Sequence, residues 1–240
     1  MGPLGPMVPS GSFHSLSSVL EGQPRSKPGS YERGTEEFSR VLTFSDGVFA
    51  IAMTLLVVGI AVPVIHHDRD SVHALADKLS DLTPNFVSFF VSFAVIGRYW
   101  AAHHEFVGLL QRIDTRLLAT NLVYLAFIAF LPFPTALLGT LFENPLSVAL
   151  YAVIVAIISG LEVVLFRQAH RRELLRRKVP DDVYRWGVAQ SLSPVVFFLI
   201  SVPVAFLDTT VAVLVWFGGI PFQAVASRWK PADADRYLSH

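Results

Sequence analysis

The stretch RVLTFSDGVFAIAMTLLVVGI, residues 40–60, has the length and apolar content of a membrane-spanning helix. A bilayer core of about 30 Å needs about 20 apolar residues in helical conformation. The stretch nevertheless begins with Arg40 and contains Asp46. An ionisable group inside a span is costly, about 2.5–3.5 kcal/mol on insertion scales. Asp46 therefore needs a partner or a function.

The composition of the whole chain is typical of a membrane protein. Of its 240 residues, 52% are apolar and 16% are charged, whereas about a quarter of the residues in soluble domains are charged. The formal net charge is zero, which gives no indication of a nucleic-acid partner. The sequence contains no cysteine, which excludes disulfides, thiolate metal sites and cysteine nucleophiles.

Six segments are long and apolar enough to cross a bilayer, so we predict an all-α integral membrane protein. Their expected bounds are Glu37–Ile65, Leu82–Leu110, Leu117–Phe142, Asn144–Phe166, Trp186–Leu207 and Thr209–Ser227. Pro132 and Pro134 lie within the third span and should kink it. We expect residues 1–36, rich in Gly, Pro and Ser, to form a disordered tail. Residues 37–228 would then form the six-helix transmembrane domain, and residues 229–240 a short C-terminal tail.

The basic residues predict the orientation of the spans. They concentrate before the first span, after the sixth, and in the second-to-third and fourth-to-fifth connections, the last of which reads RQAHRRELLRRKVPDDVYR (residues 167–185). The opposite loops contain only Arg69 and Lys78. Because basic loops remain in the cytoplasm, both termini are predicted to be cytoplasmic.

Polar side chains on the first three spans should meet at one level of the membrane. Asp46, the pair His103 and His104, and Asn121 lie at similar depths if all three spans are helical. We predict a buried hydrogen-bonded cluster there, in which Asp46 faces His103 or His104. The adjacent histidines lack the HExxH spacing of a zinc site, so we favour a structural network over the alternative of metal ligands.

The first span also has an apolar stripe that points away from Asp46. On an ideal helix, the residues within about 60° of the Arg40 direction include Phe44, Ile51, Thr54, Leu55 and Val58. Asp46 lies about 120° away and should contact a different neighbour. Taken alone, such a stripe more often indicates a packing seam.

Other polar residues lie on the second and fourth spans. Trp100 points between the directions of His103 and His104, whereas Arg98 and Glu105 share the opposite face. Arg98 and Glu105 could fasten the second span to a neighbour. Glu162, within the fourth span, is expected to pair with an interfacial arginine.

Arg40, Phe44, Ser45 and Asp46 form the motif RxxxFSD. This motif resembles the signature of the transmembrane protein 175 family, the endosomal and lysosomal potassium channels and their prokaryotic relatives. The resemblance continues through RYWAAHHEF (residues 98–106) and DTRLLATNLVYLAFIAFLPFPTALLG (residues 114–139). It covers about residues 37–227, which is all of the chain except the tails.

The resemblance implies a leak-like channel that conducts K⁺ in preference to Na⁺. In the family, aliphatic side chains of the first helices form the constriction, and the present sequence has no TVGYG-like loop that could form a carbonyl filter. Ile51 would be the principal constriction, with Leu55 and Val58 as further apolar rings. Thr54 would offer its hydroxyl to a partly dehydrated K⁺ ion.

The resemblance also implies roles for the polar residues and an assembly. The RxxxFSD residues would fasten the first span to the helices behind it, together with Trp100, His103, His104 and Asn121. A chain with one six-span repeat implies a homotetramer in a prokaryotic plasma membrane. Its partners would be other copies of itself, membrane lipids and monovalent cations, with no cofactor and no resident metal.

The alternative function is a proton-conducting pathway or a proton-coupled secondary transporter. Asp46 with His103 and His104 could relay protons, because histidine titrates near neutral pH. Against this, the sequence has no pair of Gly/Pro-broken spans in matching halves, which inverted-repeat transporters tend to have. We do not expect an enzyme, because no GxSxG or HExxH motif is present.

Overall fold

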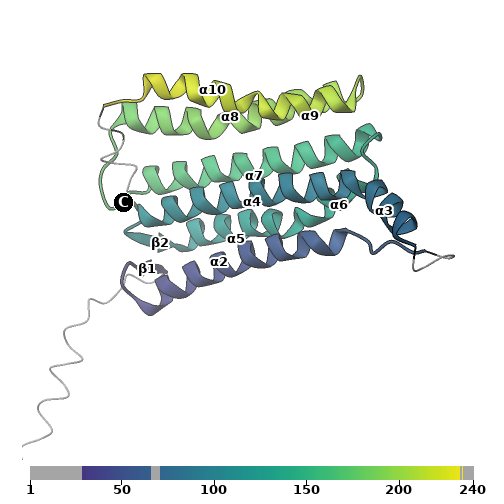
Figure 1. The fold of residues 1–240 in the computed structure, drawn as a ribbon. Helices are drawn as coiled ribbons and strands as arrows, with labels where there is room; N and C mark the ends of the chain where they lie inside the picture. Colours follow the sequence, from purple (N-terminus) through teal and green to yellow (C-terminus); the bar gives the residue numbers. More distant parts are fainter. Residues whose placement is uncertain (1–28, 66–70, 233, 235–240) are drawn as a thin grey trace, which may run out of the picture.

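The computed structural model describes residues 29–65, 71–232 and 234. Six helical spans lie side by side in a bundle (Figure 1), and within the described residues all six are long and apolar enough to cross a membrane. The spans are α2 (Glu36–Leu55) continued by the 3-10 turn η1 (Leu56–Gly59), α4 (Thr83–Gly108), α5 (Thr115–Phe130) with α6 (Pro132–Thr140), α7 (Pro145–Arg171), α8 (Asp181–Ala205), and α9 (Thr209–Phe217) with α10 (Gly219–Ala226). The predicted multi-pass helical membrane protein is therefore confirmed.

Side-chain caps fix where several spans begin. The Thr35 hydroxyl accepts a hydrogen bond from the Phe38 N–H at the start of α2 (3.3 Å). Asp114 and Asp208 do the same for α5 and α9, accepting from Leu117 (2.8 Å) and Val211 (2.9 Å). Such caps satisfy amides that have no partner within the helix. Asp208, between the fifth and sixth spans, is thus the N-cap of α9.

Proline divides the third span as predicted. α5 ends at Phe130 and α6 begins at Pro132, with Leu131 between them. The nitrogen of proline carries no hydrogen and cannot continue the helical ladder. The kink is therefore confirmed, and it turns α6 toward the end of the first span, against which it packs.

The first span is shorter than predicted, because the α-helix ends at Leu55 instead of continuing to Ile65. The chain tightens into η1 and becomes extended from Ile60 onward. A Cβ atom at Gly59 would lie 3.0 Å from Ala136 Cβ on α6. The glycine thus permits a close approach that no pattern within the first span could indicate. A further helix that we did not predict, α3 (Val72–Asp81), precedes α4.

The predicted N-terminal tail is wrong for residues 29–36. Strand β1 (Ser30–Glu32) pairs antiparallel with strand β2 (Arg112–Asp114). The guanidinium of Arg33 donates to the carbonyls of Gly108 (2.9 Å) and Leu110 (3.1 Å), which fastens this segment to the end of α4. At the other terminus, the turn η2 (Ser227–Trp229) follows α10. The remainder of both predicted tails, residues 1–28, 233 and 235–240, lies outside the described residues.

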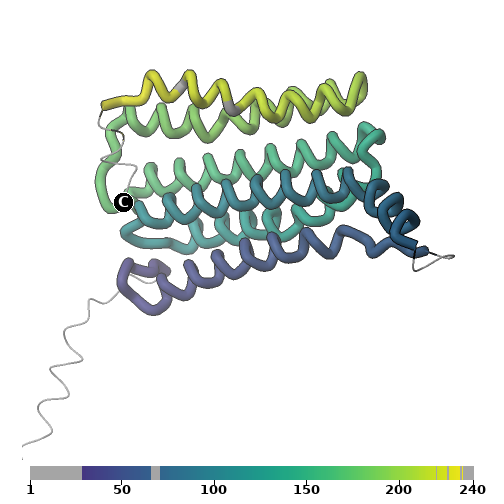
Figure 2. The backbone as a smooth tube through the Cα atoms, viewed as in Figure 1, coloured from purple at the N-terminus to yellow at the C-terminus, as the bar shows by residue number. Residues whose placement is uncertain are grey.

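α2 lies at one edge of the bundle, and the α8–α10 layer lies at the opposite edge (Figure 2). α7 lies between them and packs against α8 on one side and α5 on the other. The core therefore centres on α4, α5 and α7, with Ile96, Tyr124, Tyr151 and Ile158 fully buried. α2 packs against α4, α5 and α6, and the large apolar side chains on its other side are not covered by any of the described residues.

Candidate functional site

α2 has one buried face and one exposed face. Phe49 and Ala52, with Leu56 just beyond the helix, are 2% exposed or less and belong to the core. On the other face, Ile51 is 59% and Leu55 45% exposed. Phe44 and Val58 extend this exposed row at its two ends, and Thr54 is exposed within it. The stripe predicted from helical angles is therefore on the side of α2 that no other part of the described chain covers.

Two details modify the predicted stripe. Val58 lies on η1, where the turn is tighter than in an α-helix, although the residue is still 75% exposed. The Thr54 hydroxyl donates a hydrogen bond to the Ile51 carbonyl (2.8 Å). A hydroxyl oxygen that donates its proton keeps its lone pairs. Thr54 can therefore still present an oxygen to a cation or to water.

A buried polar network fastens the other side of α2 to α4 and α5. Asn121 on α5 donates through Nδ2 to Ser45 Oγ on α2 (3.1 Å) and accepts at Oδ1 from Nε2–H of His103 on α4 (2.8 Å). Ser45 in turn donates to the Val41 carbonyl (2.9 Å). The three side chains that form the network are between 1% and 7% exposed. Each of the three helices thus contributes one polar side chain, and Asn121 joins the other two.

Aromatic rings hold the His103 imidazole in place. Its centroid lies 5.6 Å from the stacked ring of Tyr124 and 5.5 Å from the ring of Phe49. Nε2 is bonded to Asn121, so the ring has one defined orientation. Within the described residues, no group of three His, Asp or Glu side chains is arranged to hold a metal ion. His103 is thus packed between two aromatic rings and bonded to Asn121.

We predicted a histidine opposite Asp46, and the structure gives this carboxylate a hydrogen bond to a tryptophan. Its partner is Trp100 on α4, whose Nε1–H donates to Asp46 Oδ1 (2.9 Å). Asp46 follows Ser45 by one residue, about 100° around the helix, so it points away from the core when Ser45 points into it. Both Asp46 and Trp100 are exposed, and the Trp100 ring lies 5.7 Å from His104. The contacts among Ser45, Asn121 and His103 are thus buried, and the contact between Asp46 and Trp100 lies at the surface.

The two remaining motif residues also lie on the uncovered side of α2. Phe44 is 55% exposed, and Arg40 is exposed one turn before it. Among the described residues, the Arg40 side chain forms no hydrogen bond or ion pair. Arg40 and Phe44 therefore point out of this chain, Ser45 points into it, and Asp46 lies at the surface against Trp100.

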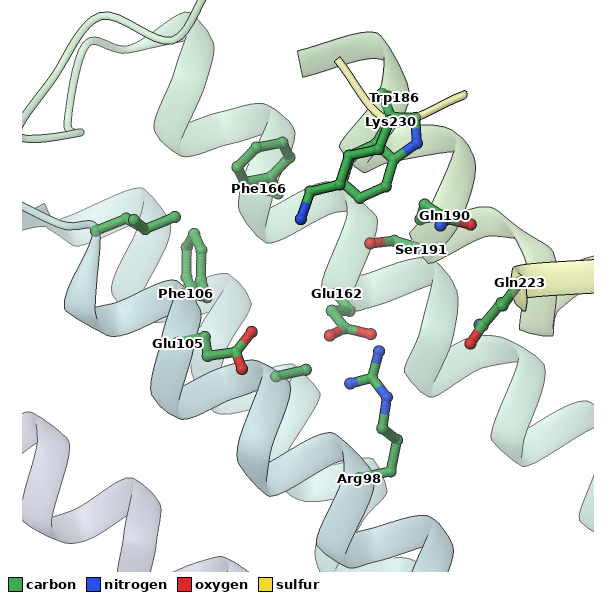
Figure 3. A pocket seen from close by; sticks show the side chains of 13 residues that line it. Arg98, Glu105, Phe106, Glu162, Phe166, Trp186, Gln190, Ser191, Gln223 and Lys230 are labelled. Atoms are coloured by element: carbon green, nitrogen blue, oxygen red, sulfur yellow. The ribbon is translucent and has the colours of Figure 1, made fainter. Parts of the chain in front are cut away.

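A second polar site lies on the far side of α4. A cavity of about 500 Å³ is lined by residues of α4, α7, α8 and α10, and its walls include Arg98, Glu105 and Glu162. Figure 3 shows the Glu162 carboxylate turned toward the Arg98 guanidinium. We expected an interfacial arginine as the partner of Glu162, but the arginine that faces it lies within the second span.

Sequence reasoning missed the polar residues that α8 and α10 contribute to this cavity. Gln190, Ser191 and Gln223 line it, and Lys230 lies near its mouth with Nζ 5.8 Å from the Trp186 ring centroid. The amide and hydroxyl side chains within otherwise apolar spans could have indicated this cavity from the sequence. Charged groups at membrane depth need hydration or partners, so this cavity is suited to hold water.

Comparisons with known proteins agree with this arrangement. Residues 40–132 match the family model described as endosomal/lysosomal potassium channel TMEM175. A protein of Streptomyces collinus named as a potassium channel is 42% identical over 103 residues, which is 43% of this chain and 48% of that protein. The human endosomal/lysosomal proton channel TMEM175 is 25% identical over 223 residues, which is 86% of this chain and 42% of that protein. The chain thus spans about half the length of these two relatives.

A solved structure extends the similarity to the whole bundle. The crystal structure of a lysosomal potassium-selective channel TMEM175 homolog from Chamaesiphon minutus matches with a TM-score of 0.63 and 31% identity. The match covers 80% of this chain and 99% of the homolog. With this identity over nearly the whole length of the homolog, the chain belongs to the TMEM175 family.

Proposed function

We propose that this chain forms a potassium-selective, leak-like cation channel whose pore is lined by α2. The observation that carries the proposal is the uncovered apolar face of α2, on which Ile51, Leu55 and Val58 are each at least 45% exposed. The names of the bacterial relatives support K⁺ as the permeant ion. No cofactor is required for this function.

The residues around this face favour a pore over a lipid contact. The same side of α2 exposes Arg40, and it also exposes Thr54 in the middle of the apolar row. A charged side chain directed into hydrocarbon is costly. Other subunits or water would satisfy these groups, so the uncovered side of α2 is better suited to an assembly with a central aqueous pathway.

The proposed assembly is a homotetramer in a prokaryotic plasma membrane. Each six-span chain supplies one α2, and closed rotational symmetry would place four copies of α2 around one axis. The side chains of Ile51 would form the narrowest ring, with rings of Leu55 and Val58 farther along the pathway. An apolar ring of this kind limits conduction by excluding water. The Thr54 oxygens would lie beside the Ile51 ring.

The buried network and the Asp46–Trp100 contact would act as anchors in this proposal. Ser45, Asn121 and His103 would hold α2 at a fixed rotation, so that Ile51 points to the axis. The contacts of Asp46 also bear on the alternative function. A proton relay through Asp46 and His103 needs them to be linked, but Asp46 bonds to Trp100 and His103 bonds to Asn121. These contacts favour the channel over the proton-coupled alternative.

The substitution Ile51→Asn tests the proposed constriction. Replacing the apolar ring with amides should raise K⁺ flux or weaken the preference for K⁺ over Na⁺ in liposomes that contain the purified protein. Leu199→Asn is the matched control, because Leu199 is 50% exposed on α8 at the other edge of the bundle. If Ile51→Asn left both flux and selectivity at the control value, the proposed constriction would be wrong.

A further inference from the structure

A cluster of arginines surrounds a cavity where α5 begins and α7 ends. The cavity has a volume of about 410 Å³ and is lined by Arg112, Arg116 and Arg172, with Asp114 among them. Gly29 and Ser30 close it on the side of strand β1. The β1–β2 pairing that joins Ser30 to Asp114 thus forms part of its wall.

The charges in this cavity do not balance. Asp114 is the one acidic residue in its lining, and both of its carboxylate oxygens are engaged. Oδ1 accepts from the Leu117 N–H (2.8 Å) and Oδ2 from Arg172 Nε (2.6 Å). Partial burial alone would raise the pKa of the Asp114 carboxyl, but these hydrogen bonds and the charge of Arg172 outweigh burial and lower the pKa. Asp114 is therefore ionised near neutral pH and offsets one of the three guanidinium groups.

Within the described part of the chain, the other two guanidinium groups have no acidic partner. Among the described residues, neither Arg112 nor Arg116 forms an ion pair. Two backbone amides at the start of α5 are not available to a ligand, because the Thr115 N–H donates to the Gly29 carbonyl and the Leu117 N–H donates to Asp114. Recognition of a ligand would therefore depend on the arginine side chains.

The position of the cluster identifies the kind of anion. The third span begins at Thr115 and the fourth ends at Arg171, so the three arginines lie at the ends of membrane spans. Phosphate groups of lipids are concentrated at this level, and the planar guanidinium fork matches their geometry. We propose that Arg112, Arg116 and Arg172 form a binding site for a phosphate group, supplied by an anionic lipid headgroup or by a soluble phosphate ester.

The site is also adjacent to the segment that leads into α2. Gly29 precedes β1, Ser30 is the first residue of β1, and residues 33–35 connect β1 to the start of α2. A ligand in the cavity would contact this segment directly. Binding at this site does not depend on ion conduction, so the proposed phosphate site is tested separately from the proposed channel function.

The test compares binding of two phosphate sources to the full-length, detergent-solubilised protein. Equilibrium dialysis with radiolabelled glycerol phosphate measures the soluble source. Native mass spectrometry in mixed micelles of detergent with phosphatidylglycerol or phosphatidylcholine measures retention of the lipid. The pocket variant is Arg112→Gln with Arg116→Gln, which leaves the Asp114–Arg172 pair intact. The control is Arg167→Gln with Arg185→Gln, which removes the same charge from exposed positions outside the cavity.

We expect the pocket variant to lose affinity by about tenfold or more, as the loss of charge-assisted hydrogen bonds implies, and the control to change by less than about twofold. Loss of glycerol phosphate binding identifies a soluble ligand, and loss confined to phosphatidylglycerol identifies a lipid headgroup. Equal losses in both variants, or no binding of either source by the unsubstituted protein, would overturn the proposal. If the double variant fails to elute like the unsubstituted protein, Arg116→Gln and Arg116→Lys provide the same comparison at an exposed position. Arg116→Lys should retain more binding than Arg116→Gln.

Discussion

Replacement of Asn121 by leucine should destabilise the bundle, because Asn121 holds three spans together. The leucine side chain has a similar size but cannot donate to Ser45 or accept from His103. Interhelical hydrogen bonds in membranes contribute about 0.6 kcal/mol each on average. A buried donor left without an acceptor, here His103 Nε2–H, costs a further ~1–3 kcal/mol. We therefore expect Asn121→Leu to lower the free energy of unfolding by about 2–4 kcal/mol.

The assay is unfolding of the purified protein in mixed micelles with increasing sodium dodecyl sulfate, followed by circular dichroism. His103→Phe supplies the second variant of a double-mutant cycle, because phenylalanine keeps a ring between Phe49 and Tyr124. In the His103→Phe background there is no imidazole N–H that could lose its acceptor. Asn121→Leu should therefore lower the free energy of unfolding by at least about 1 kcal/mol less than it does in the unsubstituted protein. Strictly additive effects, or an Asn121→Leu protein within about 0.5 kcal/mol of the unsubstituted one, would refute the network as an anchor.

The Asp46–Trp100 contact, the Asp114 carboxylate and the polar cavity beside α4 each lead to a further prediction. Asp46→Ala and Trp100→Phe each remove the contact between Asp46 Oδ1 and Trp100 Nε1, so both should reduce the oligomeric fraction in size-exclusion chromatography, with the ratio of K⁺ to Na⁺ flux unchanged. A changed ratio of K⁺ to Na⁺ flux in intact oligomers would contradict the role of this contact as an anchor. Asp114 has a lowered pKa when folded, so the stability from its charge is present above the unfolded pKa of about 3.9 and is lost as pH falls through the folded value. Asp114→Asn should therefore lower the unfolding temperature near neutral pH, and the difference from the unsubstituted protein should shrink below about pH 4; a difference that stays constant with pH would show that charge is not its cause. Because the chain has no cysteine, Ser191→Cys in the polar cavity should react with a charged methanethiosulfonate reagent, whereas the fully buried Ser201→Cys should not. Equal labelling of the two would argue against a hydrated cavity.

The sequence predicts well those features that depend on local composition. The six spans follow from their length and apolar content, and the break at Pro132 follows from the missing amide hydrogen of proline. The exposed face that contains Ile51 and Leu55 follows from helical periodicity, as long as the chain remains an α-helix. The end of α2 was not predictable in this way, because it is set by the approach of Gly59 to Ala136 on another helix.

Local sequence patterns did not predict which side chains contact each other between helices. Depth along the span correctly put Asp46 at the level of the histidines, but packing decides which side chain of α4 reaches it, and that side chain is Trp100. Glu162 likewise faces Arg98 because α4 and α7 border the same cavity. Strand β1 was missed because three residues, Ser30–Glu32, carry no strand pattern and become ordered by pairing with β2. The role of Ile51 in a pore stays a prediction. It depends on contacts between subunits, whereas the hydropathy pattern describes the spans of a single chain.

The most direct test of the proposed function is the reversal potential of currents through the purified protein in lipid bilayers, with opposed K⁺ and Na⁺ gradients. A potassium-selective pathway lined by α2 predicts reversal close to the K⁺ equilibrium potential, with no shift when a pH gradient is added. A reversal potential that follows the Na⁺ gradient, lies near zero, or moves with the proton gradient would contradict potassium selectivity and with it the proposed function.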